Sequence, residues 1–308
     1  MTRNFLVTGA AGFIGRNVMQ QLQSQGIKVS AIFNTPPDPQ DINKVTDWRD
    51  GGVTEANLSD LMPDCSVIIH CAGSGSVAHS LNAPAEDFQS NVITMQLVLE
   101  AARRQGGVSV VFPSSAGVYG AVDTMPIRVD TPNHPVSPYG VNKLIAELLV
   151  QQYGRHFNVP ATIVRLFSVY GPQLRKQLLW DACCKLGKGD ALFFGTGEET
   201  RDWVHVEDAA RLLIRAADVA SPDCVIVNGG TGASVTIRRM IEGLAERMGI
   251  GAEIRFNQQT RAGDPKHYAA DISEALATGW TPQKDLEQGL DDYVAWFLRE
   301  MAQQDKDG

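Results

Sequence analysis

The sequence predicts an α/β protein built on a doubly wound parallel sheet, with a smaller mixed α/β lobe toward the carboxyl end. Apolar runs rich in valine and isoleucine alternate with helical patterns over the first two thirds of the chain, which favours parallel strands buried on both faces. The expected strands are Asn4–Thr8, Val29–Phe33, Val67–His70, Val108–Pro113, Thr162–Phe167 and Val225–Asn228. The expected helices are Ile14–Gln25, Ala85–Gln105, Pro138–His156, Thr236–Met248 and Leu286–Met301.

Composition and charge limit the classes of function. The 308 residues are 44% hydrophobic and 20% charged, which indicates a globular protein with a substantial core rather than a disordered chain. The net charge is −8 and no basic block is present, so neither nucleic acid nor a membrane surface is expected as a partner. A bound phosphate group would need a few local cations and a helix N-terminus.

The cysteines and the apolar runs indicate the cellular compartment in which the protein is expected. Five cysteines lie at positions 65, 71, 183, 184 and 224, without metal-ligand spacing. We therefore expect reduced thiols, no metal site and a cytoplasmic location. The amino-terminal apolar run is too short for a signal peptide. No run of about 20 apolar residues predicts a membrane span.

A glycine-rich loop joins the first expected strand to the first expected helix. Gly9, Gly12 and Gly15 form a GxxGxxG pattern, and Phe13 and Ile14 open the helix. Glycines permit a tight turn and let the backbone approach a pyrophosphate, while the helix N-terminus offers free N–H groups and partial positive charge. This context predicts a Rossmann-type dinucleotide site.

The second strand leaves the choice of dinucleotide open. An acidic residue commonly holds the adenosine ribose about 20 residues after such a loop. This chain has Asn34, with neutral neighbours, at that place. No carboxylate repels a 2′-phosphate there, and no arginine attracts one, so the residues fit either NAD or NADP.

These patterns predict how the chain is divided into domains. We expect residues 1–172, with a return segment near 203–230, to form the dinucleotide-binding domain. Residues 173–202 and 231–308 are expected to form the substrate-binding lobe. Their boundary lies where regular strand–helix alternation gives way to a more mixed pattern.

A serine, a tyrosine and a lysine form a candidate catalytic set. Tyr139 and Lys143 are four residues apart at the start of an expected helix, so they share one face. A nearby ammonium stabilises a phenolate, which predicts a pKa for Tyr139 below the usual ~10. Such a phenol can exchange a proton with a sugar hydroxyl. Ser115 follows an expected strand, where it can bind the same oxygen.

These motifs identify a family resemblance. The chain is similar to the extended short-chain dehydrogenase/reductase superfamily, in its NAD-dependent epimerase/dehydratase branch, whose members modify nucleotide-activated sugars. The resemblance covers nearly the whole chain. Its further motifs are His70-Cys71-Ala72-Gly73, Asn91, Arg165 with Tyr170-Gly171-Pro172, the segment Gly195–Asp208, Arg261–Pro265 and Gly279–Pro282.

The resemblance implies roles for the catalytic and cofactor residues. Tyr139 would be the acid/base, Lys143 would tune it and hold the nicotinamide ribose, and Ser115 would position the C4 oxygen of the sugar. Asn91 would support this site. The remaining implied cofactor contacts are Asn57 and Leu58 near the adenine, and Ala72.

The resemblance also implies substrate contacts. Arg201 and Arg261 would clamp a nucleotide diphosphate, which suits an acidic protein because arginine binds phosphate bidentately. Ser168 lies where many relatives have an asparagine that touches the diphosphate. The other candidate contacts are Ser74 near the hexose, and Arg175 and Lys176. The nucleotide stays unassigned.

Departures from the family pattern narrow the reaction. Dehydratases carry an acid pair directly after the serine, whereas this chain has Ala116 and Gly117. Epimerases acting at C3 and C5 use a cysteine near Gly117 and a histidine after the YGP motif, and the segment Gln173–Gln177 has no histidine. The expected chemistry is therefore redox chemistry at C4 alone.

Three functions fit these residues to different degrees. The favoured one is a nucleotide-sugar 4-epimerase, with NAD slightly favoured as the cofactor. The alternative is an NAD(P)H-dependent 4-reductase of a nucleotide 4-keto-6-deoxy sugar. A non-catalytic dinucleotide sensor is a remote alternative, because the chain keeps its acid/base residues. The resemblance also implies a homodimer formed through a four-helix bundle by the helices Ala85–Gln105 and Pro138–His156.

Overall fold

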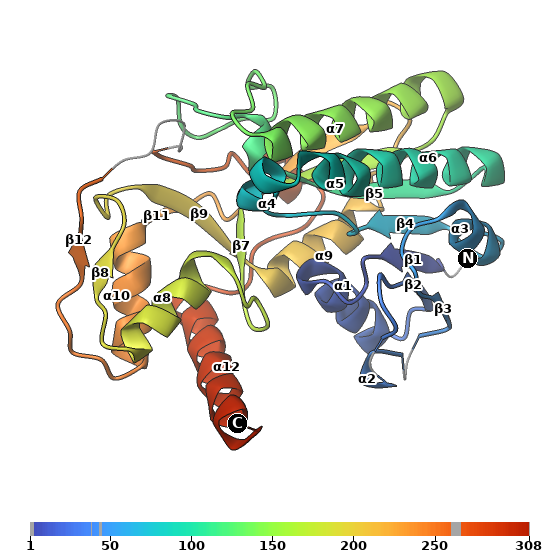
Figure 1. Ribbon diagram of the computed structural model, residues 1–308. Coiled ribbons are helices and arrows are strands. Elements are labelled where there is room, and N and C mark those ends of the chain that lie inside the picture. The colour runs from blue at the N-terminus through green and yellow to red at the C-terminus, as the bar shows by residue number, and fades with distance from the viewer. Residues whose placement is uncertain (1–2, 38, 43–44, 260–265, 308) are drawn as a thin grey trace.

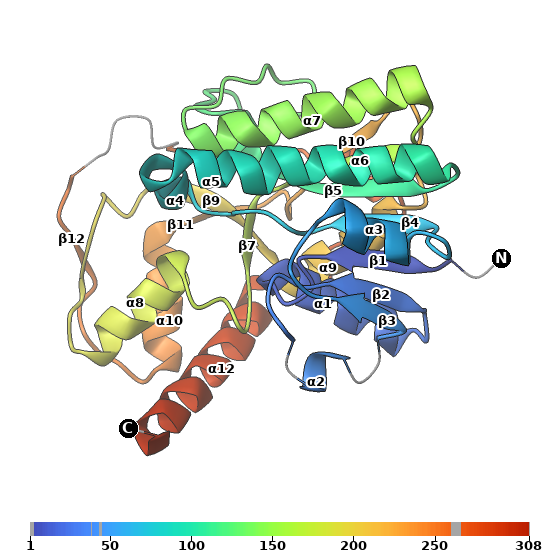
Figure 2. The same cartoon turned by 45° about the vertical axis from the view of Figure 1, so that its right-hand side comes forward.

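Seven parallel strands form the central sheet of the protein (Figures 1 and 2). The computed structural model describes residues 3–37, 39–42, 45–259 and 266–307. The strand order is β10-β6-β5-β4-β1-β2-β3. The bounds are β1 Phe5–Thr8, β2 Val29–Ile32, β3 Asp47–Arg49, β4 Val67–His70, β5 Ser109–Ser115, β6 Ala161–Leu166 and β10 Val225–Gly229. This order reverses beside β1, where a doubly wound sheet binds its ligand.

Helices cover both faces of the sheet, which confirms the predicted fold class. On one face α1 (Phe13–Ser24) packs against α9 (Val206–Ala216). On the other face lie α3 (Glu55–Leu61), α6 (Thr94–Gln105) and α7 (Pro138–Phe157), the last two side by side (Figure 2). Each face has its own core of buried apolar side chains, because parallel strands of this kind are apolar on both sides.

Several elements differ from the sequence prediction. The strand β3 and the helices α3 and α9 were not predicted, nor was the short helix α2 (Pro39–Ile42). The expected helix Ala85–Gln105 consists of α5 (Pro84–Phe88), a π-helical turn (η1, Gln89–Ile93) and α6, and α4 (Val77–Asn82) precedes it. A single apolar period does not reveal that the helix widens by one residue at the turn.

The smaller group of elements is mixed α/β, as predicted. A three-stranded sheet has the order β11-β9-β7, and a two-stranded sheet pairs β12 with β8. The helices α8, α10 and α12 enclose a third apolar core (Figure 1). The bounds are β7 Ser168–Tyr170, α8 Gln177–Gly187, β8 Leu192–Phe193, β9 Thr200–His205, β11 Ser234–Thr236, α10 Ile237–Arg247, β12 Arg255–Phe256 and α12 Leu286–Asp307.

The chain passes between the two groups of elements several times. Strand β9 leads directly into α9, and β10 is followed by β11. Helix α11 (Ser273–Ala277) then returns to β10, and Trp280 joins the α1–α9 core. We therefore propose a division into two lobes near residue 172 in which residues 273–280 belong with the large sheet. Within the described residues, no helix is both long and apolar enough to cross a membrane.

Candidate active site

The glycine loop lies at the carboxyl end of β1 and fits closely against β4. Gly9 has a φ of +64°, and a Cβ there would lie 2.6 Å from the backbone nitrogen of Ala72. A Cβ on Gly15 would lie 2.3 Å from the carbonyl oxygen of Gly9. Gly12 caps α1 without a side-chain hydrogen bond, and the first turn holds no acidic residue. The first N–H groups of α1 are thus open to an anion, as a dinucleotide pyrophosphate requires.

A cavity of about 400 Å³ extends from this loop. Its walls come from the glycine loop, the ends of β4, β5 and β6, the start of α7 and the segment after β7. This cavity brings together many of the residues that the sequence singled out. Those lining it are Gly12, Phe13, Ile14, Gly15, Ser74, Ser115, Tyr139, Lys143, Ser168 and Lys176. The glycine loop, the N-terminus of α1 and the cavity therefore fit a dinucleotide.

Local backbone structure positions the serine and the tyrosine. Ser137 caps α7 by accepting a hydrogen bond from Gly140 N at 3.1 Å, which fixes where the helix begins and where half-buried Tyr139 points. Ser115 ends β5, and its Oγ accepts a hydrogen bond from Gly117 N at 3.0 Å. The Ser115 hydroxyl also forms a hydrogen bond with Tyr139, so its one proton can be donated inside the cavity.

Lys143 is buried one helical turn beyond Tyr139. Its Nζ donates to the carbonyl oxygen of Pro113 at 3.3 Å and lies 4.8 Å from the ring centre of Phe112. Burial lowers the pKa of Lys143 to about 8, although Cys71 and other acidic neighbours raise it in part. The ammonium is therefore held beside the cavity at a cost in desolvation.

The prediction of a lowered pKa for Tyr139 is not met in the protein alone. Burial raises the pKa of Tyr139, and a hydrogen bond with Ser115 offsets this only in part. The Nζ of Lys143 lies 6.0 Å from the Tyr139 ring centre and is directed to Pro113. Desolvation of the phenolate thus outweighs attraction to an ammonium at this distance.

Asn91 lies in the π-helical turn beneath the cavity. It is 1% exposed, and its Nδ2 donates to the carbonyl oxygen of Asp87 at 3.1 Å. Its Oδ1 is buried without a hydrogen-bond partner among the described residues. Sequence reasoning missed Asp87 itself, a fully buried carboxylate that accepts from Asn142 Nδ2 at 2.8 Å. The adjacency of Asn142 to Lys143 was the available signal.

A buried ion pair joins β6 to the helix that carries Tyr139 and Lys143. Glu147 on α7 pairs with Arg165 on β6 at 2.8 Å, with side chains 0% and 3% exposed. Ser114 donates to the same carboxylate at 2.5 Å. The Arg165 guanidinium also lies 4.8 Å from the ring centre of Tyr119. The pair therefore ties β5, next to Ser115, to the helix that carries Tyr139 and Lys143.

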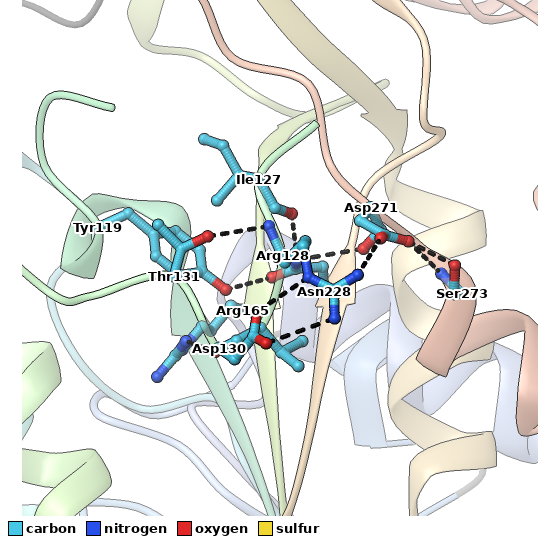
Figure 3. Close-up of polar contacts among 10 residues, drawn as sticks. Tyr119, Ile127, Arg128, Asp130, Thr131, Arg165, Asn228, Asp271 and Ser273 are labelled. Carbon is cyan, nitrogen blue, oxygen red and sulfur yellow. Dashed lines mark hydrogen bonds and ion pairs between the residues drawn. The ribbon is translucent and has the colours of Figure 1, made fainter. Parts of the chain in front are cut away.

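The amide side chain of Asn228 links Tyr119, which packs on this ion pair, to two segments that are distant in sequence. Asn228 on β10 accepts from the Tyr119 hydroxyl at 2.7 Å and donates to the carbonyl oxygens of Ile127 and Asp271 (Figure 3). Arg128 lies 3.8 Å from the Asp271 carboxylate. The segment after Ser115 is thus held to the end of the sheet and to the segment that leads into α11.

A second cavity of about 520 Å³ adjoins the first. The two share Ser168, Leu174 and Gln177 in their linings. Arg201, at the start of β9, lines the second cavity, and its guanidinium lies 5.9 Å from the ring centre of Tyr268. The two cavities are therefore neighbours, with Tyr139 in the lining of one and Arg201 in the lining of the other.

Other predicted residues lie elsewhere. Asn34 is exposed after β2, and Leu58 is buried in the core. The Asn57 amide donates to the carbonyl oxygens of Asp50 and Gly52, so it shapes that turn. Ala72 is buried against Gly9.

Arg175 lines neither of the two cavities and pairs with Glu300 on α12 at 2.5 Å, and its contact with substrate stays a prediction. Arg261 lies outside the described residues.

Comparison with known families decides the relationship. The profile described as "NAD dependent epimerase/dehydratase family" matches residues 5–228. The chain belongs to this family. The resemblance predicted from the motifs is confirmed, and the protein is an enzyme of the NAD-dependent epimerase/dehydratase class.

Individual members of the NAD-dependent epimerase/dehydratase family match along their whole length. The UDP-glucose 4-epimerase of Azospirillum brasilense is 31% identical, over 92% of this chain and 89% of its own. The UDP-glucose 4-epimerase of Thermotoga maritima, solved with UDP-glucose, has a TM-score of 0.87 at 28% identity, covering 97% of this chain and 99% of its own. MoeE5, solved with UDP-glucuronic acid and NAD, has a TM-score of 0.85 at 31% identity, covering 96% and 99%.

Proposed function

We propose that the protein is an NAD-dependent 4-epimerase of a UDP-hexose. The observation that carries this proposal is the single cavity that joins an uncapped glycine loop to Ser115, Tyr139 and Lys143. The adjoining space lined by Arg201 suits the diphosphate and base. The UDP-sugar names of the relatives support uridine as the base and glucose or galactose as the sugar.

The proposed cofactor site uses the glycine loop. Gly9, Gly12 and Gly15 let the backbone of α1 approach the pyrophosphate, and Lys143 holds the nicotinamide ribose. NAD held there would supply the hydride acceptor for oxidation at C4 and the hydride donor for reduction of the 4-keto sugar from its opposite face. The cofactor is regenerated in each cycle, so the protein should keep it between turnovers.

The side chains of this chain would handle the proton. Tyr139, as the phenolate, takes the proton from the C4 hydroxyl while C4 is oxidised, and returns it when the ketone is reduced. The positive charge of oxidised nicotinamide and the Lys143 ammonium both favour the phenolate, which offsets the burial that raises its pKa. Ser115 would donate its hydroxyl proton to the C4 oxygen while its Oγ accepts from Gly117 N.

The space beside Ser115 supports chemistry at C4 alone. A Cβ on Gly117 would lie 3.3 Å from the Ser115 Oγ and 3.7 Å from the Tyr139 ring. Neither Gly117 nor Ala116 brings a proton-transferring group to this place. Removal of water across C5 and C6 needs such a group, so the structure favours epimerisation over dehydration.

The test is conversion of UDP-glucose to UDP-galactose, followed by proton NMR with purified protein and no added dinucleotide. We expect conversion in both directions to one equilibrium mixture. Tyr139→Phe should lose at least about a thousandfold in kcat. Tyr153→Phe, on the same helix but bonded to Glu100, is the matched control and should retain activity. Absence of conversion with any UDP-hexose would refute the proposal.

A 4-ketoreductase is the second candidate, because the end of β2 carries no carboxylate to repel the 2′-phosphate of NADP. Acid release followed by mass spectrometry separates the two functions. Near-stoichiometric NAD in freshly purified protein supports the epimerase. Empty protein that takes up NADPH and reduces a nucleotide 4-keto-6-deoxy sugar supports the reductase.

We also propose a homodimer through α5–α6 and α7. Large apolar side chains are exposed on these helices and on the adjoining α4. They are Val77, Leu81, Phe88, Val141 and Leu148. Val141 and Leu148 are seven residues apart on α7, so they share a face. A second copy of this chain would cover this surface and complete a four-helix bundle.

A further inference from the structure

A threonine side chain stabilises the π-helical turn that carries Asn91. The backbone N–H of Thr94 donates to the carbonyl oxygen of Gln89, five residues earlier. An α-helix would instead direct this N–H to Ser90. The Thr94 hydroxyl supplies that missing bond, because its Oγ1 donates to the Ser90 carbonyl oxygen at 2.6 Å. The hydroxyl therefore gives the Ser90 carbonyl oxygen the hydrogen bond that it would accept from the Thr94 N–H in an α-helix.

The same hydroxyl connects to two strands through a buried histidine. Oγ1 of Thr94 lies 3.2 Å from Nε2 of His70, at the end of β4. Nδ1 of His70 lies 2.7 Å from Oγ1 of Thr8, at the end of β1. Oγ1 of Thr8 also accepts a hydrogen bond from Ala72 N at 3.3 Å. The three side chains thus form one continuous chain of hydrogen bonds beneath the cavity.

Counting donors fixes the direction of every bond. The Thr94 proton goes to Ser90, so Oγ1 must accept from His70 and Nε2 carries the imidazole proton. Nδ1 is then an acceptor, and the Thr8 hydroxyl donates to it. Burial, together with the nearby Lys143 ammonium, lowers the pKa of His70 to about 3. The ring is therefore neutral, and each hydrogen bond in the chain has one donor and one acceptor.

This chain of hydrogen bonds joins parts of the site that must keep their positions relative to one another. Thr8 immediately precedes Gly9 of the glycine loop, and His70 lines the cavity. At the other end, the π-helical turn buries Asn91 against Gly73, where an added Cβ would lie 2.7 Å from the Asn91 Oδ1. A shift of the turn toward α-helical geometry would rotate Asn91 away from this place.

We propose that Thr94 and His70 are positioning residues, which hold Asn91 and the glycine loop in register through the directed chain Thr8–His70–Thr94–Ser90. Neither residue touches the reacting atoms. The catalytic consequence rests on the proposed 4-epimerase function. The hydrogen-bond direction and the hold on the turn do not rest on it.

The test compares two variants that differ in the hydroxyl. Thr94→Val keeps the shape and removes the hydroxyl, whereas Thr94→Ser keeps the hydroxyl. For UDP-glucose epimerisation we expect Thr94→Val to lower kcat at least tenfold, with KM within twofold, and Thr94→Ser to stay within threefold of wild type. Thr162→Val is the matched control, since that buried hydroxyl also bonds a carbonyl oxygen, of Ala216, at 2.9 Å. It should leave kcat unchanged.

Two measurements need no turnover. In protein with ¹⁵N-labelled histidine, His70 should show a protonated Nε2 and an unprotonated Nδ1 between pH 6 and 9. Hydrogen exchange of amides 89–94 should be at least tenfold faster in Thr94→Val than in Thr94→Ser. A His70 protonated at Nδ1, or exchange and kcat of Thr94→Val equal to wild type, would overturn the inference. If wild type converts no UDP-hexose, the proposed function fails while these two measurements still decide the role of Thr94.

Discussion

The ammonium of Lys143 and the carbonyl oxygen of Pro113 lie 3.3 Å apart in a buried setting. This bond joins α7 to β5 just before the two serines. One neutral acceptor does not replace the hydration that an ammonium loses on burial. Lys143 therefore lowers the stability of the fold that positions it.

Replacement of this lysine should stabilise the cofactor-free protein. We expect Lys143→Met to raise the free energy of unfolding at pH 7 by on the order of 1 kcal/mol, while epimerisation is lost. The pKa of Lys143 is about 8 in the fold and 10.5 in its absence. Between these values the unfolded chain holds more protons, so wild-type stability should rise with pH relative to Lys143→Met. Urea denaturation at pH 7 and pH 10 measures this, and a Lys143→Met variant less stable at pH 7 would contradict it.

The glycine loop should not tolerate a methyl group at its third glycine. Gly15→Ala would place a Cβ 2.3 Å from the Gly9 carbonyl oxygen, so the loop must move away from the pyrophosphate. We expect purified Gly15→Ala to carry no dinucleotide and to unfold at lower temperature. Gly187→Ala is the control, because a Cβ there meets nothing within 4 Å. Mass spectrometry of acid-released dinucleotide checks both, and full occupancy in Gly15→Ala would refute the prediction.

Removing one charge of the buried Glu147–Arg165 ion pair should lower the free energy of unfolding strongly. Glu147→Gln leaves the Arg165 guanidinium buried without its counterion, which should cost about 3–5 kcal/mol. Glu147→Leu combined with Arg165→Met should cost less than the sum of the single changes. Arg103→Met removes an exposed partner of Glu100 and should cost under about 1 kcal/mol. Denaturant titration measures all of these, and equal costs for Glu147→Gln and Arg103→Met would argue against the prediction.

Removal of the serine hydroxyl should affect the chemical step. We expect Ser115→Ala to lower kcat by about 10²-fold, because one donor to the C4 oxygen is lost, with bound NAD unchanged. Ser109→Ala, at the other end of β5, should behave as wild type. Steady-state kinetics with UDP-glucose tests this pair. An effect confined to KM would mean that Ser115 binds substrate without stabilising the transition state.

The apolar face of α7 should decide the oligomeric state. Leu148 is 57% exposed in the single chain, and Leu148→Glu should convert a dimer of twice 33.4 kDa into a monomer. Leu192→Glu changes an exposed leucine on β8 of the other lobe and should leave the dimer intact. Light scattering at several concentrations distinguishes the two. A wild-type monomer would refute the proposed dimer.

Much of the fold could be predicted because its signals are local. The glycine loop and the turn from Pro138 into Tyr139 depend on residue type and spacing. The buried strands depend on unbroken apolar runs. The missed strand β3 is three residues long and half exposed, so it has no apolar run. The π-helical turn escaped prediction because an apolar period does not reveal a helix that widens by one residue, and because the contact of Thr94 with His70 joins two elements far apart in sequence.

Site details depended on contacts that sequence spacing does not show. Arg175 was expected beside the substrate, yet its partner Glu300 lies 125 residues away on α12. The pKa of Tyr139 was expected to fall because Lys143 is four residues distant. The helix alone gives that proximity, but burial and the direction of the lysine toward Pro113 come from tertiary packing.

The direct passage of β9 into α9 has a consequence for how such enzymes can be altered. His205 ends β9 in the smaller group of elements and caps α9 on the large sheet. The smaller group is therefore not one continuous piece of the chain. A protease that cuts once cannot release it, and a chimera that exchanges it between relatives needs several junctions. New substrate preference in this architecture is therefore reached most readily by replacing side chains within loops, and less readily by recombining whole pieces of chain.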